Sequence, residues 1–182
     1  MPRPFRLTPV LLAAAVAALL PGLASAQGTD LTVSGLQQDT SAPVEVTADS
    51  LAVDQAQGTA VFTGNVLIVQ GGMRLAAAEV TVTYAKAADG SIDTSTIDRM
   101  TATGGVTLAT PAEAAESQEA VYSPGPGDLV MTGDVLLTQG GNSVSGQRLT
   151  VDLDTGAGRM DGRVRTLLQT EGRQGQPAGS AP

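Results

Sequence analysis

Two stretches of the sequence decide the fold: TGNVLIVQGG, at Thr63–Gly72, and TGDVLLTQGG, at Thr132–Gly141. Sliding the chain by 69 positions aligns residues 48–84 with residues 117–153 without a gap. Eleven of these 37 aligned positions are identical. An ungapped match of this length indicates a structural repeat, in which one supersecondary unit is used more than once.

A fainter version of the same pattern lies between and after the two copies. MTATGGVTL, at Met100–Leu108, and RMDGRVRTL, at Arg159–Leu167, both place a glycine after an apolar residue and a valine two positions later. The corresponding glycines stand at positions 64, 104, 133 and 162, and the last three are 29 residues apart. The first spacing is 40 residues because it contains a polar insert, Ala85–Ser95. The sequence therefore predicts four related turns of one unit.

The repeated unit carries the period of a β-strand. Apolar positions alternate from Ala60 to Ile68 and again from Met131 to Leu137, which predicts strands with one buried face. Gly71-Gly72 and Gly140-Gly141 predict tight turns between successive strands. The glycine that precedes each valine predicts a sharp bend within the strand.

The strand after each of these turns changes its phase. Leu75 and Ala77 share one face, and Val80, Val82 and Tyr84 then take that face over. One extra residue produces such a change, as in a β-bulge, and bulges bend strands. Because a single bent module cannot cover its own apolar face, the copies are expected to stack. The predicted fold is all-β: a bent antiparallel β-jellyroll or sandwich built from internal repeats.

The first 26 residues have the features of a secretory signal. Arg3 and Arg6 precede an apolar run at Leu7–Leu20, and Ala24-Ser25-Ala26 ends the segment with small residues. A retained membrane anchor is the alternative, but a spanning helix needs about 20 apolar residues and this run is shorter. The expected product of cleavage after Ala26 has 156 residues, enough for one domain.

The rest of the chain divides into three expected segments. Residues 27–42 are weakly patterned and are expected to be a flexible N-terminal segment. Residues 43–170 contain the repeats and form the predicted β domain. Residues 171–182 have no apolar face to bury and are predicted to be a disordered tail.

Composition excludes several classes of function. Removing the two signal arginines leaves eight basic residues against eighteen acidic ones, a net charge of −10. Such a surface repels nucleic acid, so no nucleic-acid partner is expected. The chain has no cysteine and no histidine, and so it lacks thiol chemistry, the commonest general base and the commonest metal ligand. We expect no catalytic residue, no cofactor and no metal site.

Carboxylates are the remaining candidates for chemistry. Pairs such as Asp152 with Asp154, or Asp49 with Asp54, are of the kind that hydrolyses glycosides. By alternation, however, Asp152 and Asp154 lie opposite the apolar positions and face solvent. The stretch DLDTGAG, at Asp152–Gly158, lacks the third carboxylate and the closing glutamate of a calcium loop. A solvated turn is the favoured interpretation.

The apolar face and the strand ends remain to be explained. A bent sheet lined by Val, Leu, Ile and Met can enclose an ordinary core or an open groove. A stack of open modules also keeps unpaired edges at its first and last strands, here near Val44–Val46 and Val164–Leu168. Exposed edges of this kind invite another chain to add a strand.

At this point the residues match a known family. PVEVTADSL at Pro43–Leu51, the pattern A-x-F-TGNV-x-I-x-QG that follows it, L-x-A-x-x-V-x-V at Leu75–Val82 and the second TG-x-V copy resemble the OstA-like domain of the LptA-like family of lipopolysaccharide-transport proteins. The resemblance covers residues 43–168. It implies a β-jellyroll in the periplasm whose apolar interior carries lipopolysaccharide acyl chains. It also implies inner-membrane and outer-membrane partners of the transport machinery, and joining of copies end to end through terminal strands.

Alternation and the resemblance together predict the site residues. The expected lipid-binding residues are Val44, Val46, Phe62, Val66, Ile68, Leu108, Tyr122, Met131, Val135 and Leu137. The expected partner-strand edges are Val44, Glu45 and Val46 at one end and Val164, Leu167 and Leu168 at the other. The alternative function is a non-enzymatic structural repeat protein that polymerises by strand addition around a closed core.

Overall fold

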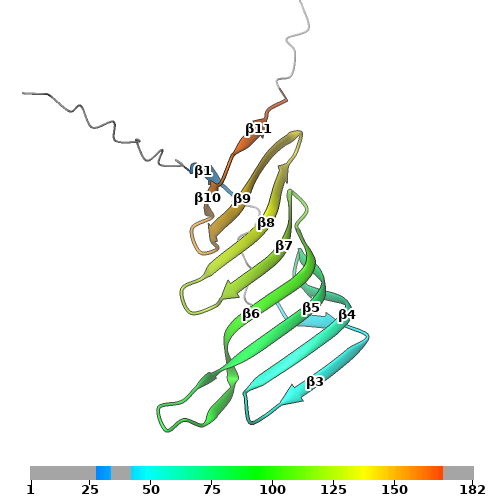
Figure 1. Ribbon diagram of the computed structural model, residues 1–182, viewed down its shortest axis with the longest axis vertical. Coiled ribbons are helices and arrows are strands. Elements are labelled where there is room, and N and C mark those ends of the chain that lie inside the picture. Colours follow the sequence, from blue (N-terminus) through cyan, green and yellow to red (C-terminus); the bar gives the residue numbers. More distant parts are fainter. Residues whose placement is uncertain (1–27, 34–41, 170–182) are drawn as a thin grey trace, which may run out of the picture.

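The computed structural model describes residues 28–33 and 42–169, which form a single antiparallel sheet (Figure 1). The predicted signal peptide and tail lie outside these residues. The strands are β1 (Thr29–Thr32), β2 (Val44–Thr47), β3 (Ser50–Asp54), β4 (Thr59–Gln70), β5 (Met73–Lys86), β6 (Ile92–Ala109), β7 (Glu113–Ser123), β8 (Asp128–Gln139), β9 (Asn142–Asp152), β10 (Ala157–Asp161) and β11 (Arg165–Leu167). The predicted all-β fold is confirmed for the described part of the chain.

The sheet follows the chain, strand after strand, along the long axis of the molecule. Its order is β1-β10-β9-β8-β7-β6-β5-β4-β2, and in Figure 1 it runs from β3 at the lower end to β11 at the upper end. At the lower end β2 and β3 both pair with β4, and at the upper end β10 and β11 both pair with β9. Each of these terminal pairs acts as one strand with a bend in the middle.

The repeated glycines make the bends. Gly64, Gly104, Gly133 and Gly162 have nearly the same positive φ, 82 to 83°. L-residues with a side chain rarely adopt this conformation, so glycine is required there. In β4, β6 and β8 the glycine coincides with a shift of register, such as the one between Thr63 and Val66. The predicted bends at the glycines are therefore present as bulges, which curl the sheet. The extra residue lies on the glycine strand, where two residues of β4 oppose one of β5, and not on the strand after the turn, where the phase change predicted it.

The two-residue turns of the repeat are also present. Gln70 pairs with Met73, and Gln139 pairs with Asn142, so each Gly-Gly dipeptide closes a hairpin. The polar insert at Ala85–Ser95 lengthens β5 and β6, whose hairpin projects beyond the neighbouring strands at the lower end (Figure 1). All consecutive strands from β4 to β10 are thus joined by local hairpins.

The N-terminal segment differs from its prediction. Residues 27–42 were expected to be flexible, yet Thr29–Thr32 forms β1 and pairs with β10. The following residue, Val33, is fully buried in the core, and its N–H donates to the Gly156 carbonyl at 2.9 Å. A short alternating run, with Leu31 and Val33 on the inner face, was sufficient to form a strand once an open edge was available to pair with it.

Candidate functional site

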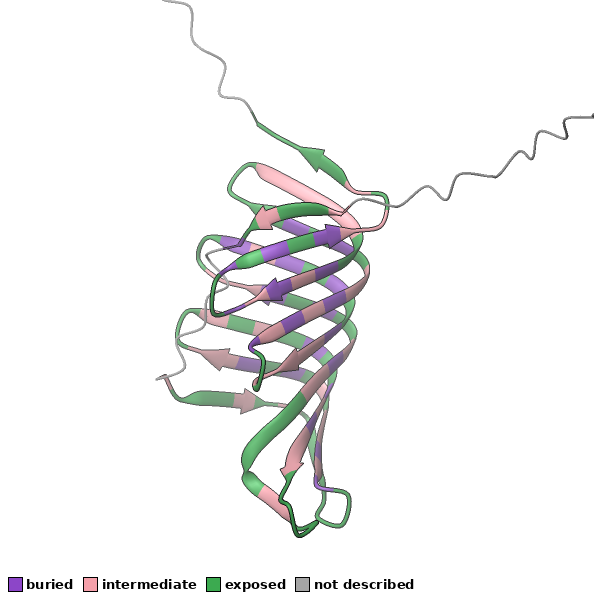
Figure 2. Ribbon diagram, turned by 90° about the vertical axis from the view of Figure 1, so that its left-hand side faces the viewer, coloured by how far each residue is buried: buried purple, intermediate pink, exposed green. Residues whose placement is uncertain are grey.

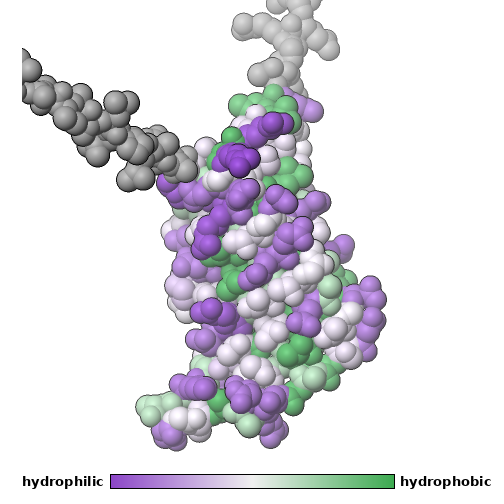
Figure 3. All heavy atoms as spheres, viewed as in Figure 1, coloured by the Kyte–Doolittle hydropathy of each residue, from purple (hydrophilic) through white to green (hydrophobic). Residues whose placement is uncertain are grey.

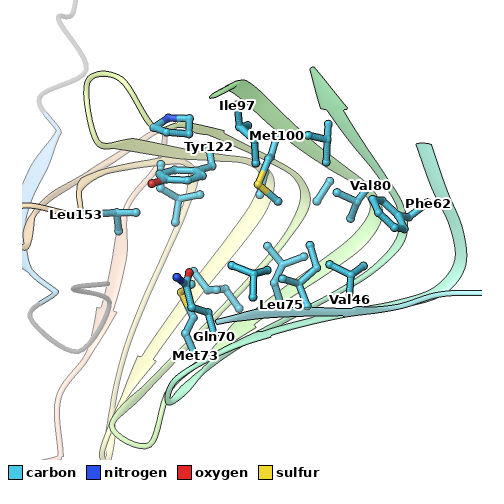
Figure 4. Close-up of a pocket in the computed structure, with 18 of the residues that line it drawn as sticks. Val46, Phe62, Gln70, Met73, Leu75, Val80, Ile97, Met100, Tyr122 and Leu153 are labelled. Carbon is cyan, nitrogen blue, oxygen red and sulfur yellow. The ribbon is translucent and has the colours of Figure 1, made fainter. Parts of the chain in front are cut away.

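A large apolar cavity, here called the groove, occupies the lower half of the curled sheet. Its volume is about 640 Å³, and inward side chains of β2, β4, β5, β6, β7 and β8 form its wall (Figure 4). Protein interiors are normally packed without voids larger than a water molecule. Ligand pockets, in contrast, typically enclose about 300–1,000 Å³. A hollow of this size and composition therefore has the properties of a binding site rather than of a packing defect.

The wall gathers all the aromatic side chains of the described residues. Phe62 on β4, Tyr84 on β5 and Tyr122 on β7 all line the groove. Aromatic side chains supply the largest single buried areas, and a protein that needed them for its own core would place them in its packed part. Here they are only partly buried, and all three line the hollow.

Two walls face one another across the groove. Figure 4 shows Ile97, Met100 and Tyr122 on one side, opposite Val46 and Leu75 on the other. These walls reach the surface, since Ile97 is 37% exposed and Val44, next along the inner face of β2 from Val46, is 56% exposed. The groove is thus open to solvent as well as apolar.

Polar side chains contribute little to the wall. The polar side chains among its described lining residues are Gln70, Ser95, Thr96 and the two tyrosines, and none of the lining residues is an acid, a lysine or an arginine. The Nε2 of Gln70 donates a hydrogen bond to the Ala42 carbonyl at 3.0 Å, which fixes this side chain at the rim. A ligand inside the groove would therefore meet hydrocarbon and aromatic surface, with no fixed charge to recognise.

Tyr122 remains a neutral phenol at physiological pH. Burial raises the pKa of its hydroxyl above the ordinary value of 10.0, and the negative charge of Asp154 raises it further. The side chain therefore presents a neutral ring to the groove.

Six of the ten predicted lipid-facing residues lie on the groove wall. They are Val44, Val46, Phe62, Ile68, Leu108 and Tyr122. The other four, Val66, Met131, Val135 and Leu137, do not line the groove and are no more than 5% exposed within the packed core. Alternation identifies the inner face correctly but does not reveal where along the sheet that face is covered by its own side chains.

The prediction missed a set of wall residues on the two longest strands. The set comprises Met73, Leu75, Val80, Val82 and Tyr84 on β5 with Ile97, Met100 and Ala102 on β6. The signal was present, because the phase change placed Leu75 and then Val80, Val82 and Tyr84 on one face.

The upper half of the sheet is closed by its own side chains. Met131, Leu149, Val151 and Met160 are completely buried there, together with Val33 after β1. Figure 2 shows this concentration of buried residues along the upper strands, whereas the strands at the lower end are mostly intermediate or exposed. The inner face is therefore a packed core at one end and an open groove at the other.

The predicted edges lie at opposite ends of the sheet. Val44, Glu45 and Val46 belong to the terminal strand β2, and Val164 precedes β11, which contains Leu167 and is followed by Leu168. Leu167 and Leu168 are 65% and 68% exposed. In Figure 3 hydrophobic surface appears at this upper end, beyond a side surface in which hydrophilic and neutral residues predominate. The upper end also carries β1, which the sequence did not predict.

The carboxylates considered for catalysis have structural roles in turns. Asp152 accepts hydrogen bonds from the N–H groups of Asp154 and Thr155, and the Thr155 bond is the main cause that lowers the pKa of Asp152. Asp49 accepts a hydrogen bond from the Asn65 side chain at 2.9 Å. Among the described residues, no three acidic side chains are grouped so that they could hold a metal ion.

No helix long and apolar enough to cross a membrane is found in residues 28–33 and 42–169.

Comparison with known proteins identifies the family. The family model described as LptA/(LptD N-terminal domain) LPS transport protein matches residues 45–157, which include both copies of the repeat and the groove-lining residues other than Val44. The chain belongs to this family. A protein of Rhizobium meliloti (strain 1021), described as uncharacterized, is 33% identical over 177 residues, covering 93% of this chain and 95% of its own.

Two further comparisons concern a protein of Pseudomonas aeruginosa. The lipopolysaccharide export system protein LptH is 36% identical over 77 residues, 42% of this chain and 43% of its own. The crystal structure of LptH, described as the LptA homologous periplasmic component of the conserved lipopolysaccharide transport device, superposes with a TM-score of 0.63. It covers 73% of this chain and 99% of its own at 20% identity, which shows a shared fold. Membership of the LptA-like family, inferred from the sequence, is thereby confirmed.

Proposed function

We propose that the protein is a periplasmic carrier that holds the acyl chains of lipopolysaccharide in the groove on the way from the inner to the outer membrane. The observation that carries the proposal is an unfilled apolar hollow of about 640 Å³ that gathers every aromatic side chain of the described residues. Family membership supports the choice of ligand. The same features favour a carrier over an enzyme.

Hydrocarbon contact supplies the binding free energy in this account. Each buried methylene contributes about 0.8 kcal/mol, so about ten methylenes contribute about 8 kcal/mol before the costs of association are subtracted. No lysine or arginine lines the groove, and the whole chain carries a net charge of −8. The phosphorylated head group is therefore expected to remain outside the groove, in water or bridged by cations.

The second part of the proposal concerns assembly. Copies of the chain, or family members in the two membranes, join end to end when the β2–β3 edge of one adds to the β10–β11 edge of the next. The exposed apolar residues at the two ends support this, with Val44, Leu51 and Val53 at one end and Leu167 and Leu168 at the other. The alternative, a structural repeat protein with a closed core, does not account for the groove.

Binding of purified lipopolysaccharide to two neighbouring variants tests the first part of the proposal. Met100 lines the groove, whereas Thr101, the next residue on β6, has its side chain on the opposite face and is absent from the groove wall. Met100→Glu places a charge among acyl chains and is expected to weaken binding at least about tenfold, because an unpaired carboxylate resists desolvation. Thr101→Glu is the matched control and should bind like the unmodified protein.

Displacement of a fluorescent fatty acid by lipopolysaccharide gives the affinity, and circular dichroism verifies that both variants are folded. A folded Met100→Glu protein with unchanged affinity, or an unmodified protein that takes up neither ligand, would contradict the proposal.

A further inference from the structure

The two ends of the sheet are complementary in direction and in the type of bend. Along the sheet, each strand that bends at a residue with a side chain is followed by a strand that bends at a glycine. In each such pair, this residue lies against the glycine. A Cβ added to Gly64, Gly104, Gly133 or Gly162 would meet, respectively, Asp49, Ala78, Gln118 or Gln147 of the neighbouring strand. The series begins at β2–β3, with Asp49 at the bend, and ends at β10–β11, with Gly162 at the bend.

The strand that continues this series beyond β10–β11 must run antiparallel to it and must bend without a glycine. The β2–β3 strand of a second copy meets both conditions. Its β3 half corresponds to the partner of β10, and its β2 half to the partner of β11, because β4 pairs with β3 before its glycine and with β2 after it. A second copy therefore fits the upper end as the next strand of the sheet.

The place of the incoming β3 is already occupied. The chain's own β1 pairs with β10 from Thr29↔Met160 to Thr32↔Ala157, and it runs antiparallel, as the incoming strand would. The β11 half has no such cover, because β11 pairs only with β9 among the described strands. Half of the upper edge is thus covered and half is open.

β1 resembles the strand whose place it takes. Leu31 and Val33 face the core, and Val33 contacts Gly158, where an added Cβ would lie 3.0 Å from the valine side chain. The incoming β3 offers the same alternation, with Leu51 and Val53 on its inner face. These two side chains are 55% and 60% exposed, although β3 pairs with β4 on its other side. On the outer face, Arg159 pairs with Asp30 at 3.1 Å. That ion pair is exposed and adds little stability.

We infer that β1 is an intramolecular cap, which occupies the β10 edge in the free protein and must be displaced before the β3 strand of a second copy can pair there. This inference rests on the end-to-end joining in the proposed function. Exchange replaces one short strand by another with similar apolar contacts. Only molecules with undocked β1 can pair with a second copy in full. The cap therefore lowers the apparent affinity between copies by a factor equal to the ratio of molecules with docked β1 to molecules with undocked β1, and it does not abolish association.

A disulfide that fixes β1 in place tests the cap. Asp30 and Arg159 are directly opposite, and such Cα atoms lie about 4.5–5.5 Å apart, within the range of roughly 4.4–6.8 Å that disulfides bridge. The chain has no cysteine of its own, so Asp30→Cys with Arg159→Cys forms a single defined pair. Thr81→Cys with Thr101→Cys is the matched control, an opposed pair inside the sheet on β5 and β6.

Sedimentation velocity across a range of concentrations measures the association of each variant. Oxidation of the β1–β10 pair is expected to weaken self-association at least about tenfold, and reduction is expected to restore it. Oxidation of the control pair should change nothing. Equal association of the oxidised and reduced β1–β10 variant overturns the cap, and so does a disulfide that links two chains, because β1 would then dock on another copy.

Two further variants separate the cap from the joint on which it rests. Leu31→Lys with Val33→Lys releases β1, and self-association is expected to strengthen about tenfold. Leu51→Asp with Val53→Asp replaces the apolar inner face of β3 by charged side chains. Association should then be lost whether or not the disulfide holds β1 on β10. If association depends on Leu51 and Val53 but not on the state of β1, the cap is wrong and the joint stands. If neither the unmodified protein nor any variant associates, the proposed end-to-end joining is wrong, and the inference about β1 is wrong as well.

Discussion

At the scale of single residues, position along the inner face decides whether a side chain packs in the core or lines the groove. Met131 and Phe62 occupy equivalent positions of the two repeats, yet Met131 is completely buried and Phe62 lines the groove. The sequence repeat is therefore not a functional repeat. At this position one copy supplies packed core and the other supplies groove wall, although Tyr122, Leu129 and Leu153 of the second copy also line the groove.

Tyr122 gives a prediction of pH dependence. Its pKa is raised in the fold, first by burial and then by the charge of Asp154. The unfolded chain therefore loses the phenolic proton at a lower pH than the folded one. The stability that this tyrosine contributes is present below about pH 10 and declines as the pH rises further. Tyr122→Phe removes this decline.

Urea midpoints of both proteins between about pH 8 and pH 11 test this prediction. The unmodified protein should lose more stability over this interval than Tyr122→Phe does, whatever the difference between them at pH 8. If the urea midpoints of the two proteins change with pH in the same way, the hydroxyl of Tyr122 has the same pKa in the folded and the unfolded chain, and the prediction is wrong.

At the scale of elements, the glycine bends are the devices that curl the sheet. Gly104 and Gly105 both have positive φ, 82° and 87°, but their surroundings differ. A Cβ on Gly104 would lie 2.6 Å from the Cβ of Ala78, whereas a Cβ on Gly105 would meet nothing within 4 Å. Gly105→Ala therefore adds backbone strain alone, and Gly104→Ala adds strain and overlap.

We expect Gly105→Ala to lower the free energy of unfolding by about 1–2 kcal/mol. Gly104→Ala should lower it by about 1–3 kcal/mol more, because Ala78 is short and held by backbone. Urea denaturation of both variants measures the difference. Equal losses would mean that the neighbouring strand moves away freely and that the bend does not depend on close approach.

The elements show why part of the structure could be predicted from the sequence. Period two, the Gly-Gly turns and the phase change at Leu75–Tyr84 are local signals, and each corresponds to a strand, a hairpin or a bulge in the structure. β1 could not be assigned in this way, because a four-residue segment with Leu31 inside it and Val33 after it forms a strand only when β10 offers an edge. The extent of the groove was equally hidden, since it depends on which side chains meet across the curled sheet.

At the scale of the whole molecule, the inner face of the sheet is a packed core in the upper half and the wall of an open groove in the lower half. Aliphatic residues and methionine are packed in the upper half, and the wall of the lower half holds the three aromatic side chains of the described residues around a hollow. Together with the β2–β3 edge at the lower end, which pairs only with β4 among the described strands, this makes the molecule directional. A chain of such molecules would present each groove next to the upper end of its neighbour.

The central claim is that lipopolysaccharide occupies the groove in the cell, and photo-crosslinking at two adjacent positions tests it most directly. A photoreactive residue at Leu75 faces the groove, and one at Ala76, the next residue of β5, is exposed on the opposite face. Irradiation of intact cells should produce a lipopolysaccharide adduct from position 75 and none from position 76. Absence of the adduct from a folded protein labelled at position 75, or equal adducts from both positions, would contradict the account.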